Sequence, residues 1–137
     1  MALPSSPEVR QFALFCVSGG LAFAVDAGLT QAWVSVLGLD PWSARALSFP
    51  VAVTCTWLFN RHFTFRVRRE LPLWREWLVY VGTQLGGLSV NLGSYAVLVG
   101  VSATAARWPV LAVAVGSVAG LLVNFLGAKH VAFKARA

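Results

Sequence analysis

Four long apolar segments, separated by short polar ones, dominate the pattern of this chain. Each is about 19–26 residues long, and a helix needs ~20 residues to cross a ~30 Å hydrocarbon core. Open strands and loops are excluded at that depth because their backbone groups would lack hydrogen-bond partners. The pattern therefore predicts an all-α membrane protein with one domain and four transmembrane helices, over residues 12–37, 42–60, 77–101 and 108–128.

The only long polar stretch, residues 61–76, is basic with Leu and Trp interleaved, so we expect it to lie along the headgroup plane. The positive-inside rule places the side richer in Lys and Arg in the cytosol. Nine of the 11 bases fall on the side that holds both termini and this loop, and only Arg45 and Arg107 fall on the other. We therefore expect both termini to be cytosolic.

Composition supports a membrane location. The chain is 58% hydrophobic and 12% charged, against roughly 25% charged in soluble domains, and a soluble domain of this size buries too little area to hide so much apolar surface. The net charge of +6 comes from bases that flank the apolar segments, which favours anionic lipid headgroups over nucleic acid. Cys16 and Cys55 lie inside apolar segments, and we expect buried free thiols.

The ends of the second and fourth segments are similar. A base, a His, two variable positions, a Phe and a base recur 68 residues apart, as Arg61-His62-Phe63-Thr64-Phe65-Arg66 and Lys129-His130-Val131-Ala132-Phe133-Lys134. The first and third segments correspond loosely, since each holds one strongly polar residue, Asp26 and Asn91. These matches predict two helical hairpins that form a parallel repeat about the membrane normal.

Asp26 is the only acid well within a predicted span, and Arg45 lies at a compatible depth. A charge at mid-span costs about 2.5–3.5 kcal/mol on insertion scales, so it usually faces a partner or a cavity. Two interpretations stay open: a structural ion pair, or a polar path that meets a sugar or a proton. Other polar residues assigned to this path are Thr64, Gln84 and Asn91, whereas Ser48 and Thr56 are as well explained by helix packing.

A second candidate site lies at the cytosolic ends of the helices. Arg61 and Lys129 are related by the repeat, each has an amide on its own helix, and Arg10 enters the same region. Bases and amides that converge there would bind a phosphate or pyrophosphate headgroup. The alternative is that these bases only snorkel to ordinary lipids, which suffices for Arg66, Arg68, Arg69 and Arg136. The predicted headgroup residues are Arg10, Asn60, Arg61, Asn124 and Lys129.

No nucleophile with a base, paired acids or phosphate-binding Gly loop is recognisable, so we expect neither an enzyme nor a catalytic residue. His62 and His130 are interpreted as interfacial residues, and no metal site or cofactor is expected. Gly19-Gly20 and Gly86-Gly87 are predicted to be points of close helix packing.

From about Gln11 to Phe133 the chain resembles the GtrA-like family of small membrane proteins. The resemblance rests on Phe12-x6-Gly19-Gly20-x5-Asp26, Ala44-x-Ala46-Leu47-Ser48-Phe49 and, most specifically, Trp57-Leu58-Phe59-Asn60-Arg61-x2-Thr64-Phe65. Asn91 and Asn124-Phe125 with Lys129-x3-Phe133 complete it. Ala128-Lys129 departs from the Asn-Arg pair that is common in the second half.

The resemblance implies translocation of a polyprenyl-phosphate-linked sugar across the bacterial cytoplasmic membrane for cell-surface polysaccharide synthesis, with a membrane glycosyltransferase as a possible partner. Because four helices hardly enclose a path for a sugar phosphate, we expect a homo-oligomer, most simply a dimer. Two other functions stay open. One is a non-transporting scaffold for a glycosyltransferase, and the other is a proton-coupled exporter that relies on Asp26.

Overall fold

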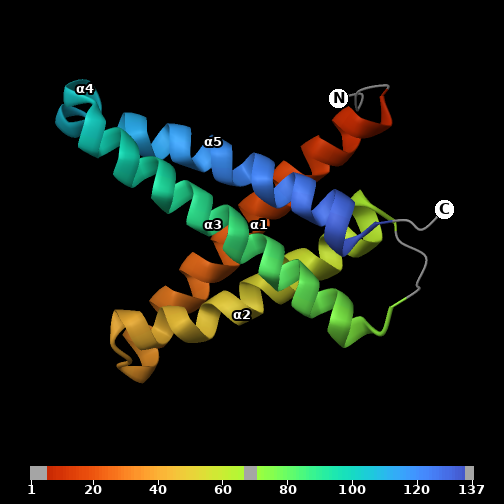
Figure 1. The fold of residues 1–137 in the computed structure, drawn as a ribbon. Coiled ribbons are helices and arrows are strands. Elements are labelled where there is room, and N and C mark those ends of the chain that lie inside the picture. Colours follow the sequence, from red (N-terminus) through yellow and green to blue (C-terminus); the bar gives the residue numbers. More distant parts are fainter. Residues whose placement is uncertain (1–5, 67–70, 135–137) are drawn as a thin grey trace. The chain divides into compact units, whose positions relative to one another are not determined.

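The computed structural model describes residues 6–66 and 71–134, and every regular element within these ranges is a helix (Figure 1). The chain divides into two compact units, Met1–Arg69 and Glu70–Ala137, and each contains one helical hairpin. The prediction of an all-α protein is therefore confirmed for the described residues. Arg68, Arg69 and Arg136, which enter the orientation count, lie outside them.

The first hairpin consists of α1 (Pro7–Leu37) and α2 (Pro41–Phe59), which pack against each other. The side chain of Ser6 caps the start of α1, and Gly38 ends it in the left-handed conformation at φ 67°, which glycine adopts without steric cost. Asp40 then caps α2 by accepting two backbone hydrogen bonds. These caps explain why the connection between the two helices is short.

Beyond its last α-helical turn, α2 continues as a short π-helix, η1 (Asn60–Thr64). The wider ring is closed by the Phe65 amide, which donates to the carbonyl oxygen of Asn60 at 2.8 Å. Asn60 and Thr64 are both buried, and the Thr64 hydroxyl donates to Asn60 Oδ1 at 2.8 Å. This segment packs against α1, where the Phe15 and Phe65 rings meet edge to face.

The second hairpin is built from α3 (Leu73–Val101) and α5 (Pro109–Gly127), joined by the short helix α4 (Ala103–Arg107). It also ends in a π-helix, η2 (Ala128–Ala132). The Phe133 amide donates to the carbonyl oxygen of Ala128 at 2.8 Å. The two π-helical ends therefore share one backbone pattern, 68 residues apart in the chain.

Glycines let α3 and α5 approach closely. A Cβ at Gly116 or Gly120 would lie 2.7 Å from a backbone carbonyl oxygen of α3, and a Cβ at Gly87 would collide with Asn124. The predicted packing role is thus confirmed at Gly87. It is not found at Gly86, Gly19 or Gly20, where an added Cβ would have no described atom within 4 Å. Adjacent residues of a helix face different directions, so only the glycine that faces the neighbouring helix is required for close packing.

Within residues 6–66 and 71–134, three helical segments are long and apolar enough to cross a membrane: Pro7–Leu37, Leu73–Val101 and Val110–Ala132. The chain is therefore a multi-pass membrane protein. Helix α2 is not among the three, and it carries Arg45 in its first turns and Pro50 inside, so the predicted count of four spans stays a prediction. Helical structure also reaches residue 64 and resumes at 73, which makes the connection shorter than the predicted interfacial loop 61–76.

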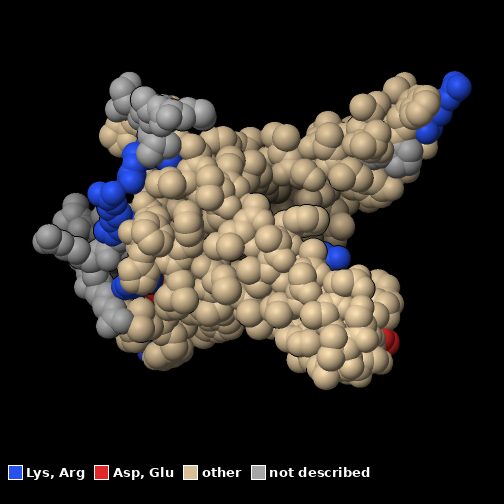
Figure 2. Space-filling model, turned by 180° about the vertical axis from the view of Figure 1, so that it is seen from behind, with Lys and Arg blue, Asp and Glu red and all other residues tan. Residues whose placement is uncertain are grey.

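Surface chemistry fits lipid exposure. Figure 2 shows a face made mostly of uncharged residues, with Lys, Arg and acids at few places, and many large apolar side chains are exposed, Phe23 and Val36 among them. Both cysteines are free thiols as predicted. The expectation that they are buried is wrong for Cys16, which is exposed, because the covered side of α1 at this level is formed by Phe15 and Ser18.

Candidate functional site

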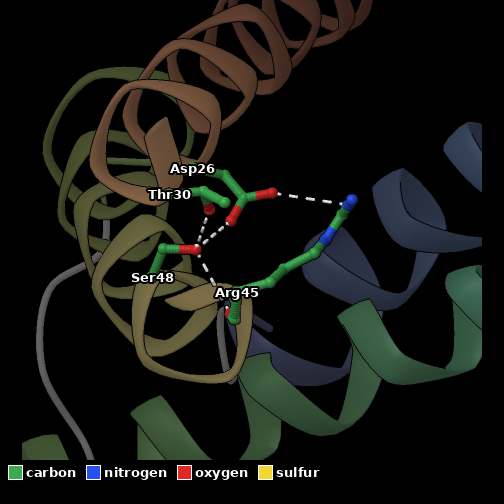
Figure 3. A network of polar contacts seen from close by, with 4 residues as sticks. All are labelled: Asp26, Thr30, Arg45 and Ser48. Atoms are coloured by element: carbon green, nitrogen blue, oxygen red, sulfur yellow. Dashed lines mark hydrogen bonds and ion pairs between the residues drawn. The ribbon is translucent and has the colours of Figure 1, made fainter. Parts of the chain in front are cut away.

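A polar cluster joins α1 and α2 (Figure 3). Asp26 Oδ2 forms an ion pair with Arg45 Nη2 at 3.4 Å, and Asp26 Oδ1 accepts a hydrogen bond from the Ser48 hydroxyl. Thr30 Oγ1 lies 2.8 Å from Ser48 Oγ. Since Ser48 has one proton and gives it to the carboxylate, Thr30 is the donor in the second bond. The pairing of Asp26 with Arg45, one of the two interpretations above, is therefore observed.

Exposure differs within this cluster. The side chain of Ser48 is fully buried and that of Asp26 is 21% exposed, whereas the Arg45 side chain is 70% exposed. The carboxylate is thus held between two partners, while most of the guanidinium surface stays accessible. Ser48 lies about 10 Å along α2 from its start, at the 1.5 Å rise per residue of an α-helix. The cluster therefore offers hydroxyl, carboxylate and guanidinium groups within the length of α1 rather than at its ends.

A pocket with a volume of about 300 Å³ lies where the start of α1 meets the end of η1. Two of the predicted site residues, Arg10 and Thr64, line it. The structure thus brings these two together, although they were assigned to different sites. The remaining lining residues are Ser6, Pro7, Gln11, Phe65 and Arg66.

Two other predicted headgroup residues of this hairpin lie in η1. Asn60 is buried and its Oδ1 accepts the hydroxyl proton of Thr64, so this amide oxygen is engaged inside the protein. Arg61 follows it and is half-buried. Neither residue lines the pocket that Arg10 shares with Thr64.

Predicted site residues of the second hairpin are spread along its two helices. The Asn124 amide packs against Gly87, and Asn124 Oδ1 is buried without a hydrogen-bond partner in the described ranges. Asn91 lies about one helical turn after Gly87 in α3, and its backbone carbonyl oxygen faces Gly116. The Lys129 ammonium lies 5.9 Å from the centre of the Phe125 ring. Arg61 and Lys129 belong to different units, so a joint grip on one headgroup stays a prediction.

Gln84 contacts Thr83 on its own helix, with Nε2 3.5 Å from Thr83 Oγ1. This contact lies within α3, and the part of Gln84 in a polar path stays a prediction. Among described residues, no group of three or more His, Cys, Asp or Glu side chains is placed to hold a metal ion.

Two residues of interest were missed by sequence reasoning. Glu76, in the first turn of α3, is only 2% exposed, and the sequence had placed it in the interfacial loop. Arg66 lines the pocket with Arg10 but had been explained by membrane topology alone. A signal existed for Arg66, because it is the last base of the motif that recurs as Lys134.

Fold and polar clusters together define a class: a small multi-pass helical membrane protein whose charged side chains gather at specific points on long apolar helices. Residues 14–136 match the model of the GtrA/DPMS transmembrane domain. The match covers most of the 137 residues. The chain therefore belongs to the GtrA/DPMS transmembrane-domain family, as the resemblance indicated.

Proposed function

We propose that this protein carries a polyprenyl-phosphate-linked sugar from the cytosolic to the outer leaflet of the bacterial cytoplasmic membrane, for cell-surface polysaccharide synthesis. No bond is made or broken in this task, so the protein acts without catalytic residues or a cofactor. Its work is to lower the cost of taking a hydroxyl-rich, charged headgroup out of water. The family to which the chain belongs supports this assignment.

The observation that carries the proposal is the cluster of Asp26, Arg45 and Ser48 on two packed helices. Ionisable groups within membrane helices are costly and usually mark a polar path. Here the ion pair lowers that cost, and the exposed Arg45 guanidinium keeps donors for a hydroxyl or phosphate oxygen. A sugar passing the cluster would exchange hydrogen bonds with it instead of losing them.

The proposal includes a fourth membrane crossing and cytosolic termini. Helix α2 packs along α1 and has 19 residues, which corresponds to about 28 Å. Because α1 is long and apolar enough to span the membrane, its partner in the hairpin would return through the same layer. The resulting sidedness follows the distribution of Lys and Arg. Homo-oligomers of this small chain would enclose the path.

Reconstituted vesicles test the function directly. The purified protein is placed in phosphatidylcholine vesicles with a short-chain polyprenyl-phosphate hexose that carries a fluorescent label, and an impermeant reductant quenches the outer leaflet. Protein-containing vesicles should lose nearly all fluorescence, and protein-free vesicles about half. If both retain half, this protein alone does not move the lipid, and a scaffold function gains support.

A matched pair of hydroxyl variants tests the cluster. Ser48→Ala removes the hydroxyl that bonds Asp26 and should slow movement. Thr54→Ala removes a hydroxyl on the same helix that donates to the Pro50 carbonyl and is not part of the Asp26 cluster, and it should leave the rate unchanged. Equal rates of lipid movement for both variants would show that the cluster is not part of the path.

A proton-coupled exporter is the competing function, and substitution of Asp26 distinguishes it from lipid translocation. Both carboxylate oxygens of Asp26 have partners in the structure, an ion pair and a hydrogen bond, which favours a structural role within the cluster. Asp26→Asn should therefore slow lipid movement without abolishing it, and Arg61→Gln should have the larger effect. An exporter predicts the reverse order, with Asp26→Asn fatal and Arg61→Gln mild.

A further inference from the structure

We infer that the pocket between the start of α1 and the end of η1 binds a phosphate group, held by Arg10 and Arg66. The ligand class is an anionic phosphate ester or free phosphate. Assigning the ester to the polyprenyl lipid rests on the function proposed above and names the residues that first capture it. This site lies within the first hairpin and uses Arg66, a residue for which sequence reasoning claimed no specific role.

The pocket brings together groups that suit this ligand. Arg10 and Arg66 reach it from two elements 56 positions apart in the chain, and Gln11 and Ser6 add polar groups. Guanidinium groups bind phosphate oxygens through paired donors in a fixed plane. A volume of about 300 Å³ is at the small end of ligand sites, which suits a phosphate better than a whole glycolipid. The prenyl chain and the sugar would extend beyond it.

The surroundings favour an anion. The pocket includes residues at the N-terminus of α1, where the helix dipole is positive. The acid of the first turn, Glu8, is exposed and does not line the pocket. Thr64, which lines the pocket, is held in place by its buried hydrogen bond to Asn60. Two cations therefore face a site whose described lining residues include no carboxylate.

The backbone at Arg66 gives an independent indication. Its φ is 49°, and it is the only non-glycine residue of the described ranges with a positive φ. An L-residue is disfavoured there and glycine would relieve the strain. Strained residues of this kind cluster at ligand sites, where the side chain has a use that offsets the backbone cost. An arginine at a position that suits glycine is such a case.

Binding of defined lipids to the full chain tests the inference. The protein is embedded in phosphatidylcholine nanodiscs and titrated with undecaprenyl phosphate, undecaprenol or inorganic phosphate, and occupancy is read by native mass spectrometry. Arg10→Gln and Arg66→Gln should each weaken undecaprenyl phosphate binding at least about tenfold, as expected when a charged hydrogen-bond donor is lost. Arg10→Lys should recover part of the loss because it keeps the charge but not the planar pair of donors.

Arg75→Gln is the matched control. It removes the same charge from the first turns of α3, where Arg75 stacks on Trp74 at 5.1 Å outside this pocket, and binding should change less than about twofold. Arg66→Gly separates binding from folding. It should keep or raise the thermal midpoint while it weakens lipid binding as much as Arg66→Gln.

Several results would overturn the inference. Equal losses for Arg75→Gln and the two pocket variants would indicate general attraction to basic residues. Undecaprenol that binds as tightly as the phosphate would show that the phosphate is not recognised. Inorganic phosphate that displaces the lipid at equal concentration would overturn the lipid assignment. The vesicle assay keeps the two proposals apart: binding without transbilayer movement sinks the proposed function alone, and movement in the double Arg10/Arg66 variant sinks this site alone.

Discussion

Gly87 is one of the glycines on which the packing of the second hairpin depends, and Gly86, its neighbour on the same helix, serves as its control. Gly87→Ala places a methyl group 2.7 Å from Asn124 Nδ2, with Oδ1 and Cγ of that amide closer still. Non-bonded heavy atoms prefer about 3.5–4.0 Å. The Asn124 side chain must therefore leave its place or the two helices must separate. Gly86→Ala meets no described atom within 4 Å.

The expected difference follows from two opposing effects. Replacing glycine by alanine inside a helix stabilises it by roughly 0.5–1 kcal/mol, and this gain is the same at adjacent positions. Overpacking a close contact costs typically about 1–3 kcal/mol and applies only to Gly87→Ala. We therefore expect Gly86→Ala to equal or exceed the wild-type stability, and Gly87→Ala to fall below Gly86→Ala by about 1–3 kcal/mol.

Thermal unfolding in detergent, followed by circular dichroism, measures this difference, with the two variants compared under one condition. Asn124→Ala combined with Gly87→Ala removes the colliding amide and should recover most of the loss, which isolates the contact in a double-mutant cycle. If Gly86→Ala and Gly87→Ala unfold at the same temperature, α3 and α5 do not approach at Gly87, and the packing described for this hairpin is wrong.

Three further predictions concern the first hairpin. Ser48→Ala should lower stability by about 1–2 kcal/mol in the same assay, because it removes the buried donor to Asp26. Thr64→Val removes the hydroxyl that donates to buried Asn60 Oδ1 and should cost about 1 kcal/mol; an unchanged midpoint would contradict this. Hydrogen bonds from Ser43 lower the pKa of Asp40 below 3.8, so its capping contribution is complete above that pH and is lost as the pH falls through the lowered pKa. Thermal unfolding measured over a series of acidic pH values should show this loss of stability. The same series with Asp40→Asn should not.

Much of the fold followed from hydrophobic segments of membrane-spanning length and their caps. The pairing of Asp26 with Arg45 could be predicted because charge inside an apolar helix needs a partner at the same depth. The helices α1 and α3 end at the last residues of the predicted segments, although they begin several residues earlier. The features that the sequence predicts correctly therefore depend on one helix, or on two helices joined by a short turn.

The pocket lined by Arg10 and Arg66 could not be predicted in the same way. Arg66 lines it two residues beyond the π-helix η1, with a positive φ. Nothing in the apolar pattern distinguishes a π-helical end from an α-helical one. The glycine pairs show the same limit, since Gly86 and Gly87 look alike in sequence and only the position of α5 separates them.

The two π-helical ends share a backbone but differ in polarity. At positions 68 residues apart, buried Asn60 and Thr64 are replaced by buried Ala128 and Ala132. Since η2 closes the same Phe amide bond without any polar pair, the π-turn itself does not require the buried hydrogen bond. The polar pair in η1 is therefore better explained by what adjoins it, the pocket of Arg10 and Arg66, than by the geometry of the helix end. The buried hydrogen bond of η1 has no counterpart in η2 and involves Thr64, which lines the pocket of Arg10 and Arg66. This difference supports the proposal that the headgroup is bound by the first hairpin, whereas close helix packing shapes the second.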